Sequence, residues 1–138
     1  MTIEELNSVK RIREKIDREN QRLEMLRVMS VPTSAIDGLP KAKPLMSMPE
    51  RVTIAISEAE ATLEELANNL IEASAELTEK IFQTFADNPL MSSVLVRMYV
   101  ADLSADEVAR SLGYTRGYIW KVHNQGLKRL TDALPKTP

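Results

Sequence analysis

The chain has 138 residues, of which 43% are hydrophobic, and a formal net charge of −2. This composition favours one or two small folded units, and the absence of cysteine excludes disulfides and thiolate metal sites and fits a reducing compartment. Few aromatic residues and only four glycines disfavour a β-sandwich or barrel, so we expect an all-α fold.

The hydropathy pattern gives no sign of a membrane segment. No apolar run approaches the roughly 20 residues that span a bilayer. The first residues, MTIEELNSVKRIREK, also lack the apolar core of a signal peptide. We therefore expect a cytoplasmic protein with no membrane partner.

An N-terminal coiled-coil segment is expected over residues 1–29, with one amphipathic helix from residue 2 to residue 29. Its apolar residues alternate three and four apart, and only Glu19 breaks this pattern. The seam consists of Val9, Ile12, Ile16, Leu23 and Leu26. Residues 30–49 contain four prolines and a glycine and cannot continue the helix, so a linker is expected there.

A second long coiled-coil helix is predicted over residues 50–87, which hold nine acidic residues and two basic ones. Its seam consists of Val52, Ile56, Ala59, Leu63, Leu66, Leu70, Ala73 and Leu77. A helix of about 37 residues is about 55 Å long, and a seam of that length needs a partner. The partner is residues 2–29 of the same chain, which makes a helical hairpin, the same helix in another chain, which makes an oligomer, or both. The acidic exterior is expected to be solvated, with docking to a basic partner as the alternative.

The C-terminal unit is expected over residues 88–134. Asp87, Asn88 and Pro89 end the long helix, and a short helix follows over residues 90–101. Ser104 and Glu107 form a capping box, in which the serine oxygen accepts the amide three residues on and the glutamate reaches back to the serine amide. A helix should therefore begin near Ala105 and end at a left-handed Gly113.

A second helix follows at once, and the pair is typical of a helix-turn-helix, whose second helix enters the DNA major groove. Thr115 can cap this helix, and its apolar side consists of Ile119, Val122, Leu127 and Leu130. Residues 113–131 carry four basic residues and no acidic one, so the local field favours double-stranded DNA despite the negative net charge. The residues expected to meet DNA are Thr115, Arg116, Gly117, Tyr118, Trp120, Lys121, Asn124, Lys128 and Arg129.

Individual roles follow from side-chain chemistry. Arg116 can form a forked contact with guanine, whereas Lys128 and Arg129 suit phosphates or the helix dipole. Trp120 has two open roles, packing against the 88–101 helix or contact with a thymine methyl group or sugar. His123 is the only histidine, and without cysteine it has no partners for a catalytic triad or a zinc site. We therefore expect a surface or phosphate-facing histidine, no metal, no cofactor and no enzyme.

The stretch VARSLGYTRGYIWKVHNQGLKRL resembles region four of bacterial sigma factors. That resemblance implies base-reading positions at Arg116, Gly117, Trp120 and Lys121. Gly117 and Trp120 depart from the family, which commonly has charged or amide side chains there, so a −35-type promoter is not implied. Nothing in the chain resembles the other conserved segments of a sigma factor.

The whole layout, two coiled-coil helices, a proline-rich break and this terminal module, resembles a family of phage and prophage late transcriptional regulators. The resemblance implies a sequence-specific DNA-binding regulator in a bacterial host cell, acting as a dimer or higher homo-oligomer, with host RNA polymerase as a further partner. Two alternatives stay open. The first is the DNA-recognition small subunit of a phage packaging terminase, and the second is an interaction protein that contacts RNA polymerase without binding DNA.

Overall fold

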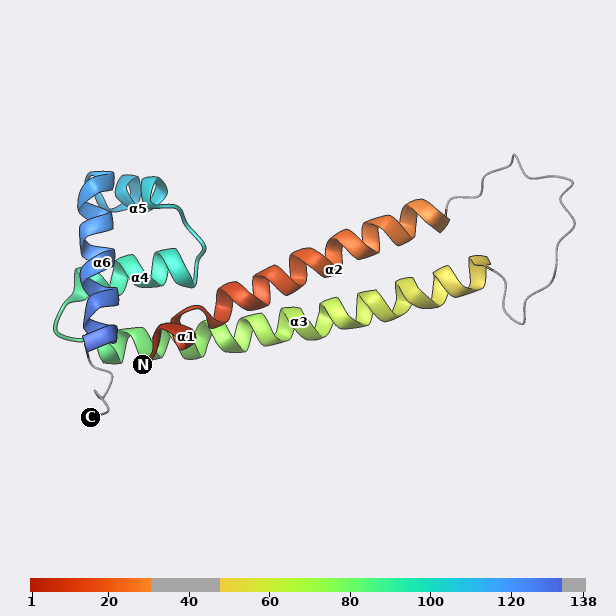
Figure 1. Ribbon diagram of the computed structural model, residues 1–138, viewed down its shortest axis with the longest axis horizontal. Helices are drawn as coiled ribbons and strands as arrows, with labels where there is room; N and C mark the ends of the chain where they lie inside the picture. The colour runs from red at the N-terminus through yellow and green to blue at the C-terminus, as the bar shows by residue number, and fades with distance from the viewer. Residues whose placement is uncertain (31–47, 133–138) are drawn as a thin grey trace, which may run out of the picture. The chain divides into compact units, whose positions relative to one another are not determined.

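The computed structural model describes residues 1–30 and 48–132, and this part of the chain is 87% helix, with no strand (Figure 1). The helices are α1 (Ile3–Leu6), α2 (Ser8–Ser30), α3 (Met48–Thr84), α4 (Pro89–Tyr99), α5 (Ala105–Leu112) and α6 (Arg116–Asp132). The predicted all-α class is confirmed. Within the described ranges, no helix combines the length and the apolar character needed to cross a bilayer. The expected linker falls almost entirely outside these residues.

The N-terminal helix is interrupted, contrary to the prediction of one helix over residues 2–29. Thr2 caps α1 by accepting the amide of Glu5 at 3.1 Å, and α1 ends at Asn7. The side-chain amide of Asn7 donates to the carbonyl of Ile3 at 3.0 Å. Short polar side chains such as asparagine compete with the backbone for hydrogen bonds, which is the physical reason for a break at this residue.

The second long helix, α3, has 37 residues and ends close to the predicted position. The chain then turns at Asn88, whose side-chain oxygen accepts the amide of Met91 at 3.1 Å. Pro89 occupies the first turn of α4, where its missing amide costs no helix hydrogen bond. The predicted short helix after the break is therefore confirmed.

The chain forms two compact units that do not follow its linear order. Met1–Arg13 and Asn69–Pro138 make the large unit, and Glu14–Asn68 make the small unit. The core of the large unit joins fully buried side chains from distant segments, among them Leu6 and Val9 near the N-terminus, Phe85 after α3 and Leu95 in α4. The first 13 residues thus complete the same core as α4, α5 and α6.

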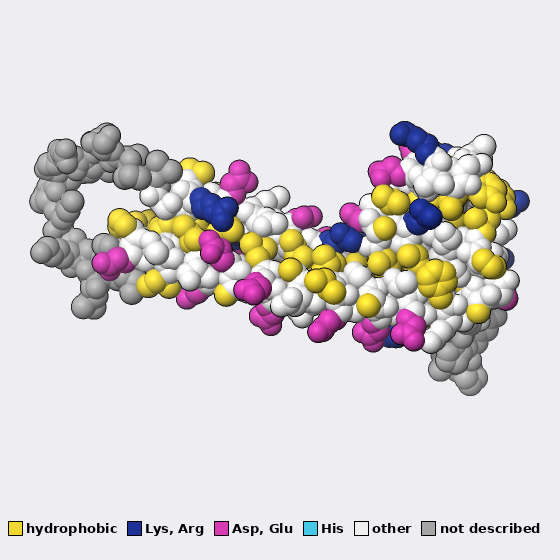
Figure 2. Space-filling model, turned by 180° about the vertical axis from the view of Figure 1, so that it is seen from behind, with side chains coloured by type: hydrophobic (Ala, Val, Ile, Leu, Met, Phe, Trp, Pro, Cys, Tyr) yellow, Lys and Arg dark blue, Asp and Glu magenta, His cyan; other side chains and the backbone are white. Residues whose placement is uncertain are grey.

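The small unit contains residues 14–30 of α2 and 48–68 of α3, which run side by side in opposite directions (Figure 1). An ion pair joins Arg27 to Glu60 at 3.6 Å. Its most buried apolar side chains are Leu23, Val52 and Ala59. Other seam residues in this unit are only half-buried: Ile16, Leu26, Ile56, Leu63 and Leu66. Figure 2 shows hydrophobic side chains at the surface where the two helices meet.

Candidate nucleic-acid interface

Local hydrogen bonds fix the ends of α5. The Ser104 hydroxyl oxygen accepts the amide of Glu107 at 3.2 Å, as the capping box predicts. The glutamate carboxylate accepts from the Ser104 hydroxyl at 3.1 Å rather than reaching the serine amide. Gly113 ends the helix in the left-handed region, with φ of 77°, and its amide donates to Ala109. Glycine suits this position because a Cβ would strain it.

The next helix, α6, begins where predicted and packs through one apolar side. The Thr115 hydroxyl accepts the amide of Tyr118 at 3.2 Å. Gly126 lies where α6 crosses α4, and a Cβ there would stand 3.1 Å from Cδ1 of Leu95. The glycine therefore lets α6 approach α4 closely. The buried side of the helix consists of Ile119, Val122, His123, Gly126 and Leu130.

The residues expected to meet DNA lie in α6 or at its N-cap and are open to solvent. All nine are exposed: Thr115, Arg116, Gly117, Tyr118, Trp120, Lys121, Asn124, Lys128 and Arg129. The helix contains one acidic residue, Asp132, at its last position. We call these exposed residues the α6 face. They give α6 a local positive charge that the acidic α3 lacks.

Two lysines on the α6 face are free of protein partners. Lys121 and Lys128 make no ion pair in the part of the chain that the structure describes. Arg116 lies 3.6 Å from a carboxylate oxygen of Asp106 in α5, and both side chains are more than half exposed. Exposed pairs of this kind contribute about 1 kcal/mol or less, so Asp106 holds Arg116 only weakly.

Arg129 is engaged within the chain. Its Nη2 lies 2.9 Å from Asp87 Oδ1, and its guanidinium carbon lies 5.0 Å from the centre of the Phe85 ring. The hydrogen bond from Arg129 lowers the pKa of the Asp87 carboxyl, which keeps the pair charged. Arg129 therefore ties the end of α6 to the junction between α3 and α4, and we leave it out of the proposed DNA contacts.

His123 is buried, so the expectation of a surface histidine was wrong. Its side chain is 6% exposed, its Nε2 lies 2.7 Å from the hydroxyl of Tyr99, and its Nδ1 lies 3.0 Å from the side-chain oxygen of Asn124. Burial lowers the pKa of His123, which favours the neutral ring. Lys10, from α2, lies 4.5 Å from the centre of the Tyr99 ring. A signal was present, because His123 is four residues after Ile119 and so shares its apolar side.

Trp120 contacts a residue of its own helix and stays partly exposed. Its indole meets the His123 ring edge-on, with ring centres 5.2 Å apart, and the side chain is still 39% exposed. Tyr114, which the sequence argument did not single out, is 45% exposed and lies 5.0 Å from the Tyr118 ring, centre to centre. Its place directly before the cap Thr115 was the available signal. Exposed aromatic rings thus accompany the basic residues of the α6 face.

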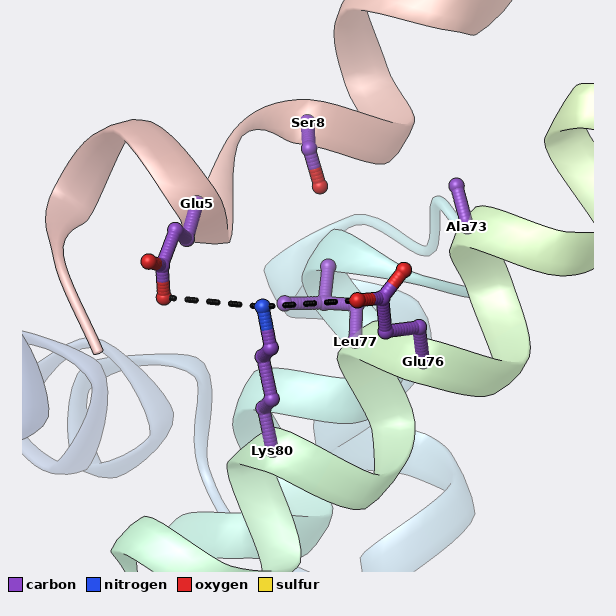
Figure 3. Close-up of a pocket in the computed structure, with 6 residues that line it drawn as sticks. All are labelled: Glu5, Ser8, Ala73, Glu76, Leu77 and Lys80. Atoms are coloured by element: carbon purple, nitrogen blue, oxygen red, sulfur yellow. Dashed lines mark ion pairs between the residues drawn. The ribbon is translucent and has the colours of Figure 1, made fainter.

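Two hollows lie in the large unit. One, of about 160 Å³, lies between the start of the chain and α3 (Figure 3). Lys80 projects into it with its Nζ 4.0 Å from Glu5 and 3.6 Å from Glu76, so its charge is already balanced. The second, of about 420 Å³, borders Trp120 and Arg116 and is lined by charges of both signs. The described ranges contain no cluster of histidine or acidic side chains suited to a metal ion.

Comparison of the chain with models of protein families, with curated proteins and with solved structures finds no match. The α6 face is therefore the feature from which a function is inferred.

Proposed function

We propose that the chain is a sequence-specific, double-stranded-DNA-binding transcriptional regulator of phage type. In this proposal α5 and α6 form a helix-turn-helix, and the α6 face enters the major groove. The observation that carries it is the α6 face, where Arg116, Lys121 and Lys128 are exposed with no acidic residue before the last position of the helix. Contact with DNA phosphates depends on such a local field and not on the net charge of the chain.

The basic residues take different roles along the helix. Arg116 and Lys121 lie in the first two turns, which in helix-turn-helix proteins contact base edges. Lys128 lies about 18 Å further along the axis than Arg116, at 1.5 Å per residue, and suits a phosphate. Removing Arg116 should therefore cost specificity, whereas removing Lys128 should weaken binding to all duplexes alike.

Asp106 competes with DNA for Arg116. Because the pair is exposed and weak, a guanine or a phosphate can displace the carboxylate. Asp106→Asn removes this competitor together with one negative charge beside the interface. The variant should bind duplex DNA more tightly than the natural chain, in the opposite direction to Arg116→Ala.

The test is a titration of the full chain against duplexes enriched from genomic DNA of bacterium and phage, followed by fluorescence anisotropy at several salt concentrations. We expect affinity to fall steeply with salt, the signature of counterion release. Arg116→Ala should weaken the binding free energy for an enriched site by about 1–3 kcal/mol. It should also lower the ratio of affinities for the enriched site and for unrelated DNA. Arg22→Ala is the matched control, since Arg22 is an exposed arginine outside α6. If the chain does not bind duplex DNA even at low salt, the proposal is refuted. The alternative of an interaction protein that does not bind DNA then remains.

We also propose that α2 and α3 form a coiled coil which pairs with a second copy of the chain. The support is the small unit, where Ile56, Leu63 and Leu66 are only half-buried by the helices of one chain. A dimer would align two α6 helices with two half-sites and add their binding energies. Size-exclusion chromatography with light scattering separates the outcomes: a dimer supports this proposal, a ring of eight or more subunits supports a packaging role, and a monomer at micromolar concentration refutes it.

A further inference from the structure

Gly117, the second residue of α6, is a glycine that nothing within the chain requires. It is exposed, and a Cβ built there would have no atom within 4 Å. Its φ lies outside the left-handed region that favours glycine. Glycine is less stable than alanine inside a helix, so neither the backbone nor packing accounts for its presence. The glycine leaves the backbone of the first turn of α6 open at the surface.

The neighbours of Gly117 on the α6 face are aromatic. Tyr114 lies three residues before Gly117, ahead of the helix, and Trp120 lies three residues after it, within the helix. Tyr118 is the next residue in the chain. Their exposed fractions are 45%, 39% and 41%. These three are half of the six aromatic side chains in the sequence. We call Gly117 and these three residues the Gly117 patch.

The rings of the Gly117 patch are held in place by the chain. Trp120 contacts the buried His123 ring, which is itself hydrogen-bonded to Tyr99 of α4. Tyr114 and Tyr118 contact one another through their rings. The patch therefore presents a positioned apolar surface. One helical turn beyond Gly117 is the ammonium group of Lys121, which has no ion pair with the described residues.

We propose that the Gly117 patch contacts the 5-methyl group of a thymine in the major groove, an inference that rests on the proposed DNA-binding function. Phosphates and polar base edges call for charged groups or hydrogen-bond partners, which Lys121 and Arg116 supply, whereas the patch offers an open backbone and aromatic rings. The thymine methyl is the apolar group that base pairs present in the major groove. The absence of a Cβ at Gly117 lets this methyl group reach the backbone of the first turn of α6, beside the aromatic residues.

The test compares thymine with uracil, which pairs identically but lacks the methyl group. Duplexes enriched by the full chain from a random pool are remade with each thymine replaced in turn by deoxyuridine, and affinity is measured by fluorescence anisotropy. One or two replacements should each weaken binding by about fourfold, the effect of losing one buried methyl group. Gly117→Ala should bind the thymine duplex more weakly and discriminate thymine from uracil by less than about twofold, because its Cβ occupies the space.

Control variants distinguish a failure of the thymine contact from a failure of DNA binding. Gly117→Ala is not expected to unfold the chain, since alanine favours the helix. Gln125→Ala changes an exposed residue of α6 outside the patch and should discriminate thymine from uracil as well as the natural chain does. If the chain binds the duplex and no uracil replacement weakens binding, the proposed thymine contact is refuted and the proposed DNA-binding function is not. Equal discrimination by Gly117→Ala and the natural chain also overturns the patch. Failure of the natural chain to bind any duplex at low salt overturns both.

Discussion

Replacing Leu6 with alanine should destabilise the large unit strongly, although Leu6 lies in a four-residue helix at the start of the chain. Its side chain is 0% exposed and belongs to the same core as Phe85 and Leu95. The adjacent part of α2 adds a polar link, because the Arg13 guanidinium donates to the carbonyl of Val100. Leu6 is thus a core residue and not part of a separate coiled coil.

The size of the effect follows from the groups removed. Leucine to alanine deletes three methyl-sized groups at about 0.8 kcal/mol each when fully buried. A residual cavity raises this cost, and movement of the short helix into the space lowers it, so we expect a loss of about 2–3 kcal/mol. For a unit of this size each kcal/mol lowers Tm by about 4–8 °C, which gives a decrease of about 10–20 °C.

Trp120 makes the measurement selective. It is the only tryptophan and lies in the large unit, so its fluorescence during thermal unfolding reports that unit and not the small one. Ile3→Ala is the matched control, because Ile3 shares α1 with Leu6 but is 37% exposed, and its Tm should change by less than about 4 °C. An unchanged Tm for Leu6→Ala would refute the assignment of residues 1–13 to this core.

Two further predictions concern α6. Gly126→Val should destabilise the large unit by about 1–3 kcal/mol in urea unfolding, because the new side chain meets Leu95 at the helix crossing, whereas Gly117→Ala should leave stability equal or higher. Burial holds the pKa of His123 below its ordinary value of 6.5, so the unfolded chain binds a proton that the folded chain does not as the pH falls below 6.5. The free energy of unfolding should therefore decrease from pH 7 to pH 5.5, and His123→Gln should flatten this decrease; equal slopes for the two proteins would contradict the burial argument.

Local chemistry is what made the ends of α5 and α6 predictable from the sequence. Ser104, Gly113 and Thr115 each act on backbone groups within four residues, so their roles do not depend on the rest of the fold. The same holds for the break at Asn88 and Pro89. The exposure of the α6 face also followed from helical spacing alone, because the apolar residues leave one side free.

Contacts between distant segments could not be predicted in this way. Spacing shows that Val9 lies on an apolar side of its helix, but it does not show that this side joins the core of the large unit. The hydrogen-bond partner of His123 is Tyr99, 24 residues away in α4. His123 lies on the buried side of α6, but the sequence prediction followed the general rarity of fully buried histidine. Arg129 gave no local sign of its ion pair with Asp87, 42 residues earlier.

The position of the α6 face depends on residues that are not part of it. Asp87 and Phe85 hold the end of the helix through Arg129, and Tyr99 holds its middle through His123. The ammonium group of Lys10 lies over the Tyr99 ring, so the start of the chain also contacts a residue that supports α6. A fragment beginning at residue 88 would lack Lys10, Phe85 and the fully buried Leu6, so it would expose apolar surface that the whole chain covers. Loss of DNA binding by such a fragment would therefore report a missing core, and only substitutions on the α6 face of the full chain can test recognition.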